Sequence, residues 1–265
     1  YDWRRFKIQS RKHITGQEAT FFFGENAAVG TTYEDIWPTG GDIPWQTTAS
    51  TVSVYSSHAA DTSAGLGVRS IEIHGLSATG ADQDEVIIMN GTTEVDSALS
   101  YIRITKMHNE TVGTYGGSHQ GTVTLRVTSG SKSGAIMSVM TGDEGAADSS
   151  VQYGSGEAQN GFYSVPLGKV AYITHIQVVP NIGTNKSVDV GLYEREGITT
   201  VSAPFLPRRI LWHESGVDIP IDKHFDSYIK IKALTDFWFR AKGSAESKVE
   251  VYCDFYLLDQ DASGA

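Results

Sequence analysis

LSATGADQDEVIIMNGTTEVD, residues 76–96, and the YIRIT that follows at residues 101–105 decide the fold class of this chain. Apolar residues alternate with polar ones along these stretches, and small or polar residues that favour turns interrupt them. Asn90-Gly91 can supply the positive φ angles of a tight turn, so we expect a hairpin there. The pattern is typical of short antiparallel strands, and it contains no catalytic constellation.

The same alternation with a period of two recurs along the chain, whereas helical periodicity is almost absent. It predicts strands over residues 51–55, 70–74, 85–89, 101–105 and 122–127, and then over 171–178, 187–193, 226–232, 236–241 and 248–258. The sequence therefore predicts an all-β fold, with two antiparallel β-sandwich or jelly-roll-like domains and an extended N-terminal arm.

The predicted organisation has four parts. Residues 1–19 form a basic and aromatic arm, and residues 20–130 form a first β-sandwich domain. Residues 131–160 are poor in periodicity and are interpreted as a linker or crossover, although residues 135–140 suit a strand. Residues 161–265 form a second β-sandwich domain. A chain of 265 residues is long enough for two domains of this size.

Charge restricts the class of partner. A net charge of −10 argues against a nucleic-acid binder that uses a broad basic surface. The exception is the N-terminal arm, because residues 1–13 hold five of the 21 Lys and Arg residues. Trp3, Arg4, Arg5 and Phe6 are the candidates for docking onto an acidic partner such as a capsid surface; the alternative is a solvated tail. We expect no membrane partner, because no apolar run has membrane-spanning length and no signal-peptide pattern is present.

Cys253 is the single cysteine, so no intrachain disulfide framework is expected and folding in a reducing cytoplasm is unobstructed. It shares one face of a predicted strand with Val249, Val251, Phe255 and Leu257. We therefore expect a buried small apolar residue rather than a reactive thiol.

Histidine spacing argues against a metal site. The histidines form no His-x-x-x-His motif, and a single cysteine cannot form a Cys-x-x-Cys motif. Scattered along the chain are His58, His74, His108, His119, His175, His213 and His224. Asp82-Gln-Asp-Glu85 lacks the spaced ligands and the glycine of a calcium loop. No nucleophile elbow is found either. The sequence predicts neither a metal, a cofactor nor an enzymatic activity.

Aromatic residues offer two alternatives. Tyr33, Trp37 and Trp45 lie on a segment rich in Pro and Gly that suits either a platform for a sugar ring or packing at a sandwich end or subunit contact. Trp212, at the end of the apolar segment Phe205–Trp212, is a further candidate for a contact surface.

Three stretches together resemble a family of uncharacterised structural proteins of tailed-phage virions, frequent in marine and environmental phages. They are FFGENAAVGTTYEDIWPTGG at residues 22–41, GLSATGADQDEVIIMNGTTEV at 75–95 and YSVPLGKVAYITHI at 163–176. The order and spacing agree over most of residues 20–260. The chain departs from the pattern at Leu76-Ser77, where the family favours Leu-Asp.

The resemblance implies a non-enzymatic virion component with tandem β-sandwich modules, assembled in the host cytoplasm. We expect a capsid-associated decoration, cement or minor capsid protein that forms a homo-oligomer and binds the major capsid protein or other virion proteins. The alternative is a tail-fibre or baseplate component that binds host glycans. A β-sandwich enzyme acting on carbohydrate is a third hypothesis, but no catalytic pair can be singled out among the 31 Asp and Glu residues.

Overall fold

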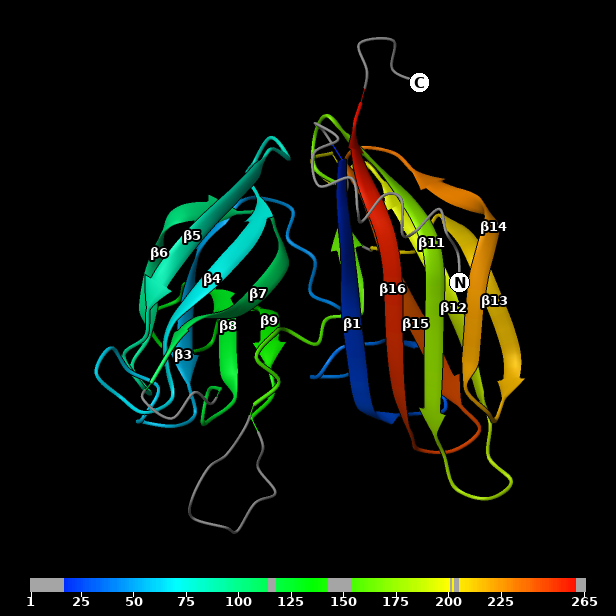
Figure 1. Ribbon diagram of the computed structural model, residues 1–265, viewed down its shortest axis with the longest axis horizontal. Helices are drawn as coiled ribbons and strands as arrows, with labels where there is room; N and C mark the ends of the chain where they lie inside the picture. The colour runs from blue at the N-terminus through cyan, green and yellow to red at the C-terminus, as the bar shows by residue number, and fades with distance from the viewer. Residues whose placement is uncertain (1–16, 114–117, 143–153, 201, 203–204, 261–265) are drawn as a thin grey trace.

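The computed structural model describes residues 17–113, 118–142, 154–200, 202 and 205–260, and this part of the chain is all-β (Figure 1). No helix in it is long and apolar enough to cross a membrane. The strands are β1 (Gln17–Val29), β2 (Glu34–Asp35), β3 (Ser50–Ser56), β4 (Val68–Leu76), β5 (Asp82–Ile88), β6 (Val95–Tyr101), β7 (Arg103–Val112), β8 (Val123–Val127), β9 (Ile136–Met140), β10 (Phe162–Ser164), β11 (Lys169–Asn181), β12 (Val188–Glu196), β13 (Arg209–Val217), β14 (Ile221–Ile231), β15 (Thr235–Gly243) and β16 (Ser247–Asp259). The predicted fold class is confirmed.

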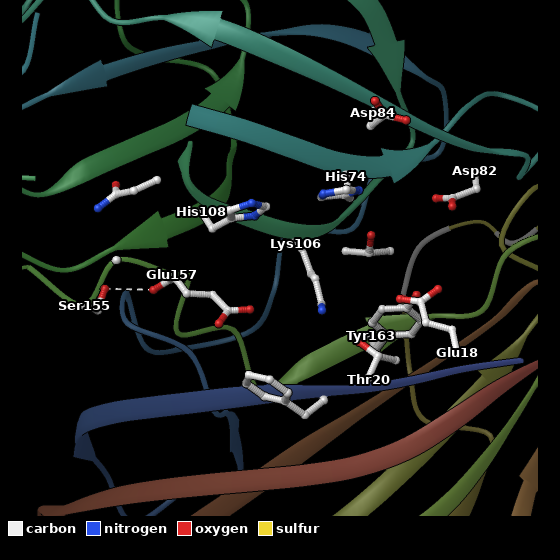
Figure 2. Close-up of a pocket in the computed structure, with 14 residues that line it drawn as sticks. Glu18, Thr20, His74, Asp82, Asp84, Lys106, His108, Ser155, Glu157 and Tyr163 are labelled. Atoms are coloured by element: carbon white, nitrogen blue, oxygen red, sulfur yellow. Dashed lines mark hydrogen bonds between the residues drawn. The ribbon is translucent and has the colours of Figure 1, made fainter. Parts of the chain in front are cut away.

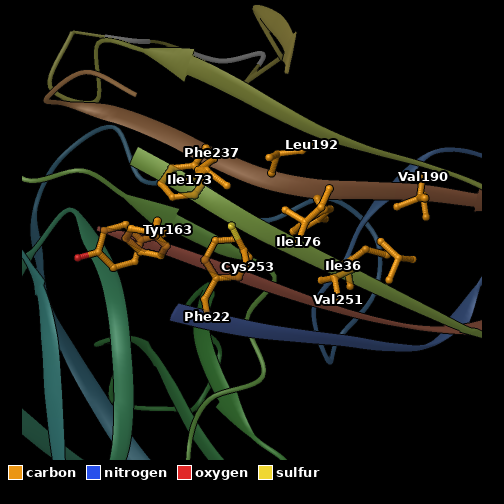
Figure 3. Close-up of a cluster of buried hydrophobic side chains, with 14 of the residues drawn as sticks. Phe22, Ile36, Tyr163, Ile173, Ile176, Val190, Leu192, Phe237, Val251 and Cys253 are labelled. Carbon is orange, nitrogen blue, oxygen red and sulfur yellow. The ribbon is translucent and has the colours of Figure 1, made fainter. Parts of the chain in front are cut away.

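Both ends of the described chain build one sandwich, which we call the terminal sandwich. Its first sheet has the order β1-β16-β11-β14, and its second has the order β10-β15-β12-β13, with β2 added to β15. All pairings within it are antiparallel. The alternating positions of the long strands bury a core between the two sheets, which includes Phe22, Ile173, Val190, Phe237 and Cys253 (Figure 3).

The second sandwich, which we call the inserted sandwich, consists of β3 to β9. One of its sheets has the order β6-β3-β8-β9, and the other has the order β5-β4-β7. It lies beside the terminal sandwich, next to β1 (Figure 1). Its core is equally apolar and includes Val54, Ile71, Tyr101 and Leu125.

The predicted domain boundaries do not agree with the observed pairing of the strands. Residues 20–130 are not one domain, because β1 pairs with β16 from Gln17 opposite Leu258 to Val29 opposite Ser247. Residues 131–160 are not simply a linker, since β9 pairs with β8 inside the inserted sandwich. The inserted sandwich thus interrupts the terminal sandwich between β2 and β10. Local alternation cannot reveal a pairing between strands that are more than 200 residues apart.

The hairpin also lies at a different position from the predicted one. Gly91 has the expected positive φ of 60° and Thr93 N donates to Asn90 O, but β5 pairs with β4 whereas β6 pairs with β3. The turn at Asn90-Gly91 therefore carries the chain from one sheet to the other. The hairpin lies one turn earlier, between β4 and β5, where Gly80 has a φ of 80°.

Nine of the ten predicted strands each coincide with one observed strand. The tenth, over residues 101–105, is divided between the end of β6 and the start of β7. The residue at the break, Ile102, packs with Leu76 and Ile198 at the contact between the two sandwiches.

Candidate functional site

The predicted docking residues of the N-terminal arm, Trp3, Arg4, Arg5 and Phe6, lie outside the described residues. The remaining predicted site residues, Tyr33, Trp37, Trp45 and Trp212, are described, and they do not form one platform.

Trp37 and Trp45 are buried, with 3% and 7% of their surface exposed. Trp37 Nε1 donates to Gly40 O at 2.9 Å. Trp45 packs edge-on against Phe162 and Trp238, with 5.2 and 5.5 Å between ring centroids. The predictions of a glycan platform or a subunit anchor at these two residues are therefore wrong. They are internal packing residues, which is the other alternative that the sequence left open.

Trp212 belongs to the strand β13, and Tyr33 lies beside this strand. The hydroxyl of Tyr33 is 3.0 Å from Nε2 of His213, and Lys242 Nζ lies 5.1 Å from the centre of its ring. Trp212 is half-buried and packs against the core of the terminal sandwich. Both residues are accessible at this side of the molecule.

A buried carboxylate joins the two sandwiches. Asp236 in β15 accepts hydrogen bonds from Arg103 in β7, from Arg195 in β12 at 2.6 Å and from Ser164 at 2.6 Å. Burial works to raise the pKa of Asp236, but the guanidinium groups of Arg103 and Arg195 hold it below its usual value. Both arginines also lie over the ring of Trp45, with their guanidinium carbons 4.9 and 5.1 Å from its centre. Trp45 thus helps to fix the inserted sandwich onto the terminal one.

A polar cleft of about 810 Å³ opens between the two sandwiches (Figure 2). Glu18, Thr20 and Phe21 of β1 line one wall, and side chains of β4, β5 and β7 line the other, among them His74, Asp82, Asp84, Lys106 and His108. Burial raises the pKa of Asp82, and the neighbouring carboxylates of Glu18 and Asp84 raise it further. The cleft therefore has an excess of carboxylates and suits a cation better than an anion.

Two histidines in the cleft share one carboxylate. Glu72 lies opposite His108 in the pairing of β4 with β7, and its two oxygens are 3.5 Å from Nε2 of His74 and 3.1 Å from Nε2 of His108. The imidazole rings stack with 5.6 Å between their centres. The three ligand atoms lie within 4.8 Å of one another, so the group could hold a metal ion.

The expectation that the histidines are scattered holds along the chain but not in space. A second group, His175, Asp222 and His224, meets the same 4.8 Å limit on the terminal sandwich. Sequence reasoning missed both groups because it tested spacing within one segment, whereas antiparallel pairing brings together residues of separate strands. The available signal was a spacing of two residues within a strand, which places Glu72 and His74 on one face of β4 and Asp222 and His224 on one face of β14.

One side of the terminal sandwich is open. β13 and β14 are the outermost strands of its two sheets and lie at the same side of the molecule (Figure 1). Within the described chain, β13 pairs only with β12 and β14 only with β11. Ile210 in β13 and Ile219 in the connecting turn are 58% and 68% exposed. Edge strands offer unpaired backbone groups to other chains, and exposed apolar side chains beside them favour such contacts. We call this side the open edge.

No protein-family model and no curated protein matches the sequence. Among solved structures, the subviral particle of VP2 from infectious bursal disease virus matches with 8% identity, covering 92% of this chain and 77% of that one, at a TM-score of 0.19. The structure of the Gt strain of the same virus matches with 8% identity over 96% and 79% of the two chains, at a TM-score of 0.18. Similarity at this level does not establish a shared fold or function.

Proposed function

We propose that the chain is a non-enzymatic structural component of a virus particle, of the decoration, cement or minor capsid type. The observation that carries this proposal is the open edge, where both sheets of the terminal sandwich end in strands with exposed apolar side chains. The sequence resemblance to tailed-phage virion proteins over most of residues 20–260 supports it.

The open edge suits assembly for a physical reason. Shell proteins form contacts that are repeated over symmetric copies, and stable contacts bury about 800 Å² on each partner. Leu206, Ile210, Ile219 and Tyr228 are exposed on or near β13 and β14. Half-buried Trp212 of β13 packs against the core of the terminal sandwich, and the accessible part of its large amphipathic ring adds to the surface at this side. The major capsid protein, another virion protein or a second copy of this chain is the partner that we propose for this side.

The rigid junction between the sandwiches supports the same role. A protein that holds neighbouring subunits together must keep its own two domains in a fixed orientation. The buried ion pair of Arg103 with Asp236 fixes the orientation of the two sandwiches. The alternative of a tail component that binds glycans loses its main support, because Trp37 and Trp45 are inside the molecule. We therefore retain the capsid-associated role.

Binding to particles tests the proposal. Particles that lack this chain would be mixed with the purified protein and sedimented. We expect the wild type to sediment with them and the double variant Ile210→Lys, Ile219→Lys to bind at least about tenfold more weakly, since buried apolar anchors carry most of an interface's energy. The matched control is Val86→Lys, Ile88→Lys, which changes two exposed apolar residues on β5. Equal binding by the edge variant and the control would contradict the proposal.

A further inference from the structure

The outer face of the sheet β1-β16-β11-β14 carries a group of polar side chains that the structural role does not use. His175 in β11 and His224 in β14 are opposite each other in the strand pairing, and their rings stack with 4.3 Å between centres. Asp222, on the same face of β14, places Oδ1 2.6 Å from Nε2 of His175 and 3.5 Å from Nε2 of His224. We propose that these three side chains form a binding site for a divalent transition-metal ion, with Zn²⁺ as the preferred ion.

A β-bulge aims His175 toward this face. The register of β11 shifts between Ile173 and His175 against both of its neighbours, β14 and β16. Ile173 before the shift and Ile176 after it both point into the core. The additional residue in between lets His175 lie on the outer face while its side chain stays almost fully buried. Bulges of this kind commonly re-aim a side chain at a functional position.

A further carboxylate orients the buried imidazole. Nδ1 of His175 lies 3.1 Å from Oδ2 of Asp254 in β16, whose side chain is 15% exposed. Nε2 of the same ring points at Asp222 on the other side. When the Nδ1–H group of His175 donates a hydrogen bond to Asp254, Nε2 faces the carboxylate of Asp222. A second proton or a cation must then lie between Nε2 and this carboxylate. An imidazole held by a carboxylate through one nitrogen and bound to metal through the other is the usual arrangement of protein zinc sites.

The ligand set fits Zn²⁺ in number and type. Two imidazole nitrogens and one carboxylate oxygen at about 2.0–2.1 Å are common zinc ligands, and three of them leave a fourth position for water or for a group of a neighbouring protein. Ligand atoms of a tetrahedral zinc site are roughly 3.3 Å apart, which follows from these bond lengths. The 3.5 Å between Asp222 and His224 already suits this geometry. The 2.6 Å between Asp222 and His175 must widen, and the side chain of Asp222 can move because it is 62% exposed.

The ion would have a structural effect that can be measured. β14 is an edge strand that pairs only with β11 within the described sheet, and the site connects these two strands on their outer side. A bound ion would therefore fasten β14, one of the two strands of the open edge, to β11. Because only the folded chain brings the three ligands together, binding must raise the thermal stability of the protein.

Titration of the metal-free, untagged full chain with Co²⁺, followed by visible absorption and then by competition with Zn²⁺, tests the site. We expect a cobalt spectrum of a site with nitrogen and oxygen ligands, and a rise in Tm on adding Zn²⁺. His224→Ala should lower the affinity at least about 100-fold. Asp254→Asn should lower it about 10–100-fold, as loss of an orienting carboxylate does. The exposed side chain of His224 makes misfolding of its variant a minor concern, and circular dichroism checks it.

Two control variants separate this site from other histidines. His213→Ala removes an exposed imidazole on β13, and His108→Ala breaks the group in the cleft. Both should keep the affinity and the rise in Tm of the wild type. The proposal fails if the wild type binds no ion at equimolar concentration, or if His224→Ala binds as the wild type does. It also fails if binding is lost only in His108→Ala, which would place the ion in the cleft.

Discussion

Arg103 donates two hydrogen bonds to Asp236, from Nε to Oδ1 at 2.9 Å and from Nη2 to Oδ2 at 3.0 Å. The first residue begins β7 of the inserted sandwich and the second lies in β15 of the terminal sandwich, so the pair crosses the junction between them. Both side chains are almost completely buried. A two-pronged contact of this kind fixes orientation as well as distance.

Removing one partner of this pair should be costly. Arg103→Ala leaves Asp236 buried, with Arg195 and Ser164 as its remaining side-chain partners in the described part of the chain, and we expect a loss of about 3–5 kcal/mol in the free energy of unfolding. Urea denaturation measures it. The matched control is Lys169→Ala, which breaks a partly exposed pair with Asp259 and should cost less than about 1 kcal/mol. Equal losses in the two variants would mean that the junction does not depend on the buried pair.

Asp35 should make stability depend on pH. Burial raises its pKa from 3.8 to about 6. Hydrogen bonds from the Ile43 amide and the Trp238 indole and the charge of Arg240 lower this pKa, but the effect of burial is larger. The folded state thus holds the proton more tightly than the unfolded state. The resulting stabilisation is full below pH 3.8 and is lost as the pH rises through about 6, a change of up to roughly 3 kcal/mol.

The variant Asp35→Asn isolates this contribution, because the amide cannot titrate. We expect the wild type to lose stability relative to Asp35→Asn between about pH 4 and about pH 7, because this range spans the pKa of Asp35 in the unfolded and in the folded state. Asp42→Asn should weaken the pH dependence in part, because the charge of the Asp42 carboxylate also raises the pKa of Asp35. Parallel profiles of wild type and Asp35→Asn would refute the prediction.

Gly24 in β1 marks a close approach of two backbones. A Cβ atom at this position would lie 2.3 Å from Cα of Gly161, just before β10. Neither backbone can move without shifting a sheet, so Gly24→Ala should destabilise the protein by about 1–3 kcal/mol. At Gly30 the nearest atom would be Oε1 of Glu34 at 3.5 Å, so Gly30→Ala should be nearly neutral. Thermal unfolding of both variants measures the difference; similar Tm values would contradict it.

Cys253 should be inert in the folded protein. It is fully buried in the core of the terminal sandwich, as expected from the sequence, and burial raises its thiol pKa well above the usual value. A disulfide reagent should therefore react with it only at the rate of unfolding, and at once in concentrated denaturant. Rapid reaction under native conditions would show that the core opens far more readily than its packing indicates.

The strand positions could be predicted from the sequence because alternation is local. β4, with Ile71, Ile73 and the outward Glu72 and His74 between them, shows the period of two clearly. β1 could not be identified in the same way, since Phe21, Phe22 and Phe23 follow one another without alternation. Its place beside β16 is set by pairing over a very long sequence distance, and the domain boundaries were wrong for that reason.

The candidate sites could be predicted less well. Trp45 is a residue type that is common in binding sites, but whether a tryptophan faces solvent depends on which strands cover it. Trp45 is covered by Phe162 of β10 and Trp238 of β15. The histidine groups arise from register: His175 meets His224 only because β11 and β14 pair with a bulge at this point. Neither relationship has a signal within a short window of sequence.

Cryo-electron microscopy of virus particles that contain this chain tests the central claim most directly. The account predicts density for both sandwiches on the capsid shell, with β13 and β14 against a neighbouring subunit. Density only at the tail tip, or on the shell with β13 and β14 facing solvent, would contradict it.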